Sequence, residues 1–138
     1  MKKRVIDTNA LISFVTDRNP GQQEKIAAIF EDAARLKVTI LCPQNVLTEF
    51  VYVLEKIYSH PKSRICSMIA DFVALPAVQI THAVDFQQLL KLWPENIPDF
   101  GDAIVATVCK AEKNAKIVTF DVKFSRALQS IGLNTVRW

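Results

Sequence analysis

Four acidic residues each lie just past an apolar run of the chain, and their joint placement could support metal-dependent chemistry. They are Asp7, Glu49, Asp102 and Asp121. Each apolar run has the composition of a buried strand or of a strand followed by a helix start. The carboxyl ends of parallel strands meet at one edge of an open sheet, so we expect the four carboxylates to converge there. Clustered carboxylates repel one another without a cation, and oxygen ligands suit Mg²⁺ or Mn²⁺, so the sequence predicts a metal site.

The first two acids also have structural explanations when each is taken alone. Asp7 could cap a helix that begins after the first strand, which typically stabilises a helix by about 1 kcal/mol. Thr8 could cap that helix equally well, which would leave Asp7 free for another role. Glu49 could be a solvated side chain paired with Lys56, but it stands in an otherwise apolar stretch where a lone acid is costly unless it has a function.

The other two acids come from the second half of the chain. Asp99 and Asp102 flank Gly101 at a helix start, where both would interact favourably with the helix dipole. We assign Asp99 as the cap or an outer-shell helper and Asp102 as the ligand, while which of them lies closer to an ion stays open. Asp121 ends a strand and could be an ordinary turn residue. Thr119 lies on the same side of that strand and could hold a water or orient a carboxylate.

The elements that must position these acids alternate between strands and helices. Such alternation predicts an α/β sandwich with a mostly parallel sheet, built as one domain over residues 1–138. The apolar helices over about residues 43–75 could cover the sheet or also form a subunit interface. Five strands are expected, over residues 5–6, 38–42, 77–80, 116–120 and 135–136, with helices in the segments between them.

Composition and charge narrow the possible classes of protein. Half of the 138 residues are hydrophobic, which is enough for a core, and no apolar run is long enough to span a membrane. The net charge is +3, and it becomes +7, from 17 basic and 10 remaining acidic residues, if metal neutralises the four acids. A basic body around such a pocket suits a polyanion. The three cysteines form no CxxC pair, which predicts reduced thiols and a cytoplasmic protein.

Other α/β classes that gather acids or bind phosphates match the sequence less well. A receiver-type phosphoacceptor would need paired acids after the first strand and a lysine at a later strand end, but Asp7 is followed by Thr8 and Asn9. A haloacid-dehalogenase phosphatase would need Asp-x-Asp, and the second position is Asn9. Nucleotide-binding Rossmann and P-loop folds require glycine-rich turns, whereas the three glycines of this chain are widely separated.

The motifs that carry the four acids resemble those of the PIN domain family, and more specifically those of stand-alone VapC-type toxins from prokaryotic toxin–antitoxin pairs. Their order and spacing extend over nearly the whole chain. The opening motif and the Gly-Asp-Ala segment are fairly specific together. The matching segments are Val5-Ile6-Asp7-Thr8-Asn9-Ala10-Leu11, Thr48-Glu49-Phe50, Phe100-Gly101-Asp102-Ala103-Ile104-Val105-Ala106-Thr107 and Val118-Thr119-Phe120-Asp121.

The resemblance implies a three-layer PIN-like sandwich and an Mg²⁺- or Mn²⁺-dependent ribonuclease. It places the metal and the catalysis at the four acids, with Thr8, Asn9, Asp99 and Thr119 around them. It also implies an RNA substrate, a homodimer and a cognate VapB-type antitoxin that blocks the site. The alternative is a catalytically silent PIN-like module that only binds RNA or a partner protein.

The sequence also predicts roles in RNA binding or subunit contact for several residues outside the four motifs. Lys3, Lys123 and Arg126 could hold an RNA backbone, although each could equally be part of a solvated face. His60 and His82 lie outside the motifs and are not assigned as general bases. A subunit contact is expected on the apolar helices, around Tyr52, Ile57, Tyr58 and Met68.

Overall fold

A four-stranded parallel sheet forms the centre of the computed structural model, which describes all 138 residues. The spatial order of its strands is β3-β2-β1-β4, and every neighbouring pair is parallel. The prediction of a mostly parallel sheet is therefore confirmed. The strands are β1 (Lys2–Ile6), β2 (Val38–Pro43), β3 (Val78–Thr81) and β4 (Ala115–Val118).

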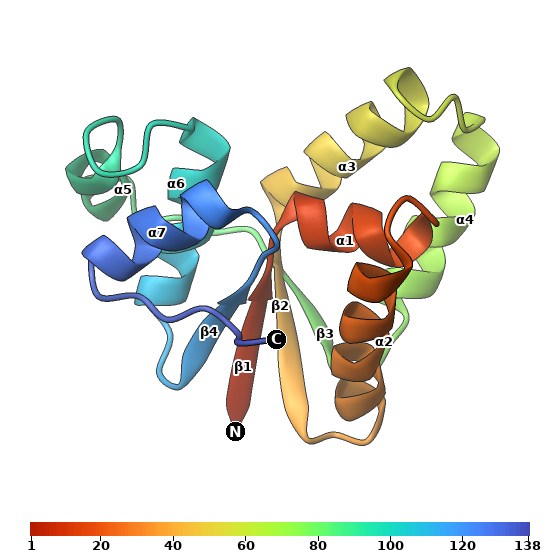
Figure 1. Cartoon of the computed structure of the whole chain (residues 1–138), viewed down its shortest axis with the longest axis horizontal. Helices are drawn as coiled ribbons and strands as arrows, with labels where there is room; N and C mark the ends of the chain where they lie inside the picture. Colours follow the sequence, from red (N-terminus) through yellow and green to blue (C-terminus); the bar gives the residue numbers. More distant parts are fainter.

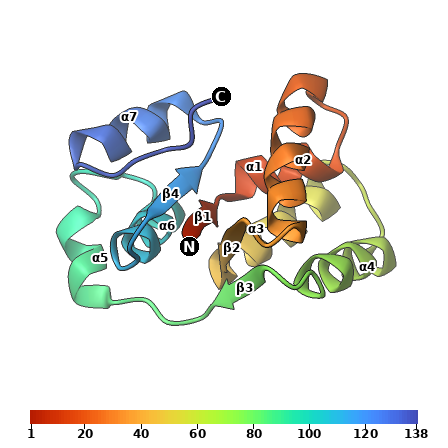
Figure 2. The same cartoon turned by 90° about the horizontal axis from the view of Figure 1, so that it is seen from below.

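Seven helices cover the two faces of the sheet and complete a three-layer sandwich. Helices α1 to α4 lie on one side of the strands, and α5 to α7 lie on the other (Figure 1; Figure 2). This is the three-layer arrangement that the sequence predicts. The helices are α1 (Thr8–Val15), α2 (Pro20–Ala34), α3 (Gln44–Lys56), α4 (Lys62–Val73), α5 (Phe86–Leu92), α6 (Phe100–Lys110) and α7 (Val122–Ser130).

Burial on both faces explains why strands β1 and β4 each end in two successive apolar residues. In a half-exposed sheet hydrophobic and polar residues alternate, but a strand covered by helices on both sides is apolar at successive positions. Val5 and Ile6 of β1 are both fully buried, and Ile117 and Val118 of β4 are buried beside them. These strands are part of one hydrophobic core of 30 buried residues. The core holds the strand ends, and the residues that follow them, in fixed positions.

The chain reverses its direction across the sheet between β1 and β4. From β1 it moves outward to β2 and β3, and then it crosses back to β4 on the other side of β1. Ile6 pairs with Val118, and the backbone N–H of Asp7 donates to the Val118 carbonyl at 3.2 Å. Beyond these two strand ends the chain departs to helices on opposite faces. Open α/β sheets bind ligands in the crevice that such a switch point creates.

The expected fifth strand is absent as a strand, so the sheet has four strands where the sequence predicts about five. Thr135 forms only an isolated parallel bridge with Ile117. Between α7 and Thr135 lies Gly132, just after the helix ends. Its φ of +79° is a conformation that glycine adopts more readily than other residues. Three residues after Thr135, the ring of Trp138 stacks on the ring of Phe120, with 4.8 Å between the ring centroids. The segment therefore runs beside β4 too briefly to continue a ladder.

Candidate active site

The four predicted acids line one pocket at the switch point of the sheet. The pocket, called the acidic pocket below, has a volume of about 200 Å³. Its lining combines residues that follow β1 and β4 with residues of α3 and α6, so tertiary structure joins parts of the chain more than 100 residues apart. Ten residues line it and only one is hydrophobic: Asp7, Thr8, Asn9, Asn45, Glu49, Asp99, Gly101, Asp102, Val105 and Asp121.

Asp7 is the most deeply placed acid of the pocket. Its side chain is only 4% exposed, and its Oδ1 accepts a hydrogen bond from the backbone N–H of Ala10 at 2.8 Å. Asp7 is thus the N-cap of α1, and the alternative that Thr8 caps this helix is wrong because Thr8 is already the first helical residue. Burial raises the pKa of Asp7 to about 7, although the Thr119 hydroxyl and the Ala10 N–H lower it in part.

Asp102 lies in the first turn of α6 and faces the same charges. Burial is the main cause that raises the pKa of Asp102 to about 7, and Asp99, Asp7, Asp121 and Glu49 raise it further. Asp99 is the N-cap of α6, since its Oδ1 accepts from the backbone N–H of Asp102 at 2.8 Å. Burial therefore favours the protonated form of the two most buried acids of the pocket when no cation balances their charge.

Asp121 and Glu49 lie at the exposed rim of the pocket. Asp121 is the N-cap of α7, with its Oδ1 accepting from the backbone N–H of Phe124 at 3.0 Å. The Thr119 hydroxyl accepts from the backbone N–H of Asp121 at 3.0 Å, which holds the turn after β4. Glu49 does not pair with Lys56, because Lys56 contacts Glu55 at 3.4 Å. The salt-bridge alternative for Glu49 is therefore wrong.

Three helix N-termini bring positive partial charge to this edge of the sheet. Asp7, Asp99 and Asp121 cap α1, α6 and α7 respectively, and all three residues line the acidic pocket. The unpaired N–H groups of a helix start stabilise nearby carboxylates. Capping and a functional role are compatible at these positions, because a cap bond to one carboxylate oxygen fixes the orientation of the whole group.

Gly101 lies where the first turn of α6 meets α3, and an added side chain there would crowd only the carboxylate of Asp99. A Cβ at Gly101 would lie 3.2 Å from Asp99 Oδ1, 3.5 Å from Asn45 Nδ2 and 3.7 Å from Glu49 Oε2. The Asn45 amide donates from Nδ2 to the Gly101 carbonyl at 3.3 Å. Sequence reasoning missed Asn45. Its position four residues before Glu49 on one helix was the available signal, because such residues share a face.

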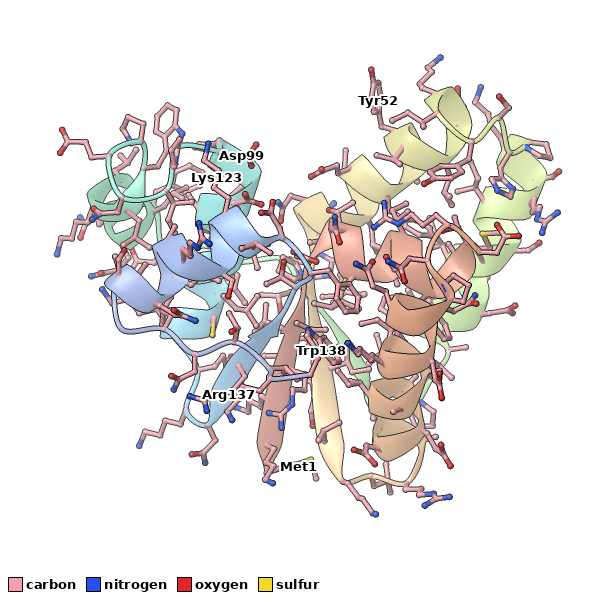
Figure 3. All side chains as sticks on the ribbon, viewed as in Figure 1. Met1, Tyr52, Asp99, Lys123, Arg137 and Trp138 are labelled. Carbon is pink, nitrogen blue, oxygen red and sulfur yellow. The ribbon has the colours of Figure 1, made fainter.

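The remaining predicted residues divide between the pocket and the rest of the molecule. Thr8 and Asn9 line the pocket, whereas Thr119 is buried and is not one of its lining residues. His60 and His82 do not line it. Lys3 pairs with Glu112 at 2.6 Å, so its ammonium group is engaged away from the pocket. In the view of Figure 3, Lys123 on α7 and Asp99 both lie at the end of the molecule where the strands terminate.

The chemistry of the pocket fits a divalent cation that prefers oxygen. The donor atoms available are carboxylate oxygens together with Asn45 Oδ1, a buried acceptor with no hydrogen-bond partner. No group of three or more His, Cys, Asp or Glu side chains is arranged to hold an ion. Mg²⁺ usually binds one or two carboxylates and keeps several waters, so a complete protein cage is not required. The donor set therefore fits Mg²⁺ or Mn²⁺.

A second hollow of the molecule has the opposite character. This apolar groove has a volume of about 310 Å³ and lies between α1, α3 and α4, and nine of its ten lining residues are hydrophobic. Met68 lines it. Tyr52 and Ile57, which the sequence places at a subunit contact, are 62% and 67% exposed. Figure 3 shows Tyr52 projecting from α3 away from the body of the protein.

The chain belongs to the PIN domain family, whose model matches residues 4–128. It is also similar to a VapC ribonuclease of Aquifex aeolicus. The two proteins are 22% identical over 136 residues, which cover 96% of this chain and 95% of that protein. No helix of the chain has both the length and the apolar character needed to cross a membrane.

Solved structures with the same fold include two that contain VapC proteins. One is VapC20 of Mycobacterium tuberculosis, described as a toxin that cleaves the sarcin–ricin loop; its TM-score is 0.70 at 17% identity, covering 98% of this chain and 99% of that one. The other is VapBC2 of Rickettsia felis bound to a DNA fragment from its promoter. Its TM-score is 0.70 at 20% identity, with 99% and 98% of the two chains covered.

Proposed function

We propose that this chain is a VapC-type endoribonuclease, the toxin of a toxin–antitoxin pair, which hydrolyses RNA phosphodiester bonds with Mg²⁺ or Mn²⁺. The observation that carries the proposal is the gathering of Asp7, Glu49, Asp102 and Asp121 in one polar pocket of a PIN-family chain. Similarity to a VapC ribonuclease along nearly the full length supports the same reading. On this proposal residues 1–138 act as one PIN-like domain.

The role of each acid in the pocket would depend on how deeply it is buried. Asp7 and Asp102, the two most buried acids, would hold the cation, and Glu49 and Asp121 would complete its surroundings directly or through water. When bound, the ion would lower the pKa of a water and neutralise charge on the leaving oxygen. The cap bonds to Asp7 and Asp121 hold those carboxylates in position before the ion arrives. No lysine, histidine or cysteine lines the pocket, and none is needed as a nucleophile.

RNA and an antitoxin are the partners that this site would take. A cation must first neutralise the acids, after which the basic remainder of the molecule attracts the phosphate backbone. Lys123 and Arg126 of α7 are exposed and would contribute at the rim. A VapB-type antitoxin could occupy the same acids with an arginine, whose guanidinium pairs well with carboxylates and needs no metal. VapBC2 is a precedent for such a partner.

We also propose that the chain acts as a homodimer in the cytoplasm. The exposed apolar side chains at Tyr52 and Ile57 support a subunit contact on α3 and the segment after it. Two of the three free cysteines, Cys42 and Cys109, are buried, and burial raises the pKa of each thiol. Such inert thiols agree with a reducing compartment.

The test is cleavage of a structured RNA by purified protein with Mg²⁺, with excess chelator, and after Mg²⁺ or Mn²⁺ is restored. We expect cleavage only when a divalent ion is present, and RNA binding that weakens as salt rises. Undiminished cleavage in chelator would refute the metal mechanism. RNA binding without cleavage under every metal condition would favour the catalytically silent module.

A further inference from the structure

Asn45 connects two helices at the acidic pocket and also carries a buried acceptor without a partner. It is the second residue of α3, one helical turn before Glu49, and it lines the acidic pocket. Its Nδ2 donates to the Gly101 carbonyl at 3.3 Å, which connects α3 with the first turn of α6. Its Oδ1 is buried and has no hydrogen-bond partner, although the residue as a whole is only partly buried.

The contact with Gly101 fixes which way the amide points. A carbonyl oxygen can only accept, so the amide nitrogen must face Gly101 and the amide oxygen is left as a free acceptor. No side chain or backbone group of the protein is placed to donate to this oxygen. A buried acceptor without a donor costs free energy, and native proteins rarely leave one unpaired. Since Asn45 lines the acidic pocket and no protein group donates to this oxygen, a water in the pocket can be its donor.

We propose that Asn45 is a positioning residue of the metal site, whose Oδ1 accepts a hydrogen bond from a water in the hydration shell of the divalent ion. This inference rests on the proposed function, because it needs an ion in the acidic pocket. Mg²⁺ retains several waters when carboxylates bind it, and those waters need acceptors. Loss of a group that holds the outer shell of a metal typically weakens metal affinity by roughly 10- to 100-fold. Asn45 supplies such an acceptor on a rigid helix, and its amide nitrogen is fixed by Gly101.

A purely structural role makes different demands on the same side chain. If Asn45 only braces α3 against α6, the important atom is Nδ2, and any residue without that donor weakens folding. If it holds the ion's water, the important atom is the oxygen, and an aspartate at this position keeps it. Asn45→Ala removes both groups, whereas Asn45→Asp keeps an acceptor oxygen, loses the donor and adds a carboxylate charge. The two variants therefore separate the roles.

The experiment measures Mn²⁺ dissociation constants by isothermal titration calorimetry, with thermal unfolding of each metal-free variant beside it. Gln44→Ala is the matched control, because Gln44 is the adjacent residue of the same helix, is exposed and contacts His82 at 3.1 Å outside the pocket. We expect Asn45→Ala to weaken Mn²⁺ binding by roughly tenfold. Asn45→Asp should bind at least as tightly as the wild-type protein, and Gln44→Ala should bind like it.

Two outcomes would overturn the proposal for Asn45 without touching the nuclease proposal. One is an Mn²⁺ affinity of Asn45→Ala equal to that of Gln44→Ala. The other is loss of affinity in Asn45→Asp together with a lower unfolding temperature, which would mark the residue as a brace only. Asn45→Asp also gives a reading if Asn45→Ala fails to fold. A wild-type protein that neither binds Mn²⁺ nor cleaves RNA would instead overturn the proposed function itself.

Discussion

Helices α1 and α3 each contribute to two hollows of opposite character, the acidic pocket and the apolar groove. The first turn of α1 gives Thr8 and Asn9 to the pocket, and its later turns give Leu11, Phe14 and Val15 to the groove. Along α3, Asn45 and Glu49 line the pocket, whereas Leu47 and Phe50 line the groove. The polar start of α1 and the polar face of α3 thus point to the sheet edge. The apolar residues of both helices point toward α4.

The two hollows each lower the stability of the isolated domain, but for different physical reasons. Carboxylates clustered in the pocket repel one another, and burial raises the pKa of Asp7 and Asp102 to about 7. Apolar side chains left open at the groove and on α3 lose hydrophobic stabilisation of about 25 cal/mol for each Å² exposed. A cation relieves the first cost and a protein surface relieves the second. If the two regions are independent, a substitution in one should leave the property of the other unchanged.

The largest effect is expected for Asp7→Asn, which removes a charge from the pocket and nothing from the groove. RNA cleavage should fall by more than the roughly 100-fold that loss of an outer-shell partner costs. Thermal stability without metal should stay equal or rise, because asparagine still caps a helix and the desolvated carboxylate is gone.

Asp85→Asn is the matched control for Asp7→Asn. Asp85 caps α5 through the backbone N–H groups of Gln87 and Gln88 and lies outside the acidic pocket. This variant should cleave RNA at the wild-type rate in the same gel assay. Retained activity with lost stability in Asp7→Asn would show that Asp7 acts only as a cap.

The next effect concerns the apolar surface near the groove. Tyr52→Glu and Ile57→Glu should convert the dimer to a monomer at micromolar concentration, because each places a charge in the proposed subunit contact. Both side chains are exposed in the single chain, so the free energy of unfolding of the monomer should change by no more than about 0.5 kcal/mol. Light scattering checks the assembly.

Leu90→Glu provides the control for that surface, since Leu90 is an exposed apolar residue of α5 on the other side of the sheet. It should leave the assembly unchanged. A wild-type protein that is already monomeric at this concentration would remove the proposed contact.

A smaller effect is expected from pH on the metal-free protein. The folded pKa values of Asp7 and Asp102 are about 7, above the ordinary value of 3.8, so the folded state binds more protons than the unfolded state between these values. Stability from these groups is therefore fully present below about pH 4 and is lost as pH rises through 7. Urea unfolding at several pH values with chelator measures this loss.

The same titration gives two internal checks. Mg²⁺ should reduce the loss of stability, and Asp7→Asn should make it shallower, because one of the two raised groups is absent. Stability of the metal-free protein that rises between pH 5 and 7 would contradict the strain inferred for the pocket.

The smallest effect separates capping from chemistry at Asp121. Asp121→Ala should cost about 1 kcal/mol of unfolding free energy, whereas Asp121→Asn should cost much less because it keeps the bond to the Phe124 N–H. Both variants should cleave RNA more slowly. Full activity in Asp121→Asn, measured beside its urea unfolding curve, would leave Asp121 with a structural role alone.

Local patterns predicted the elements well where burial is uniform. The apolar runs before Asp7 and Asp121 are strands covered on both faces, and the acid before Phe100 caps a helix. Local patterns predicted the structure less well where contacts with residues distant in sequence determine it. The segment at Thr135 has strand-like residues but makes one bridge only, and Lys3 is engaged by Glu112, which lies 109 residues away.

The sequence by itself determined which residues could meet at one edge, because a parallel sheet brings all its strand ends to the same side. Only the tertiary structure decided how deeply each acid lies. The switch point between β1 and β4 buries Asp7 and leaves Asp121 at the rim, although both follow strands and cap helices. Helical spacing puts Asn45 on the same face as Glu49, but its contact with the Gly101 carbonyl exists only because the fold brings α6 against α3.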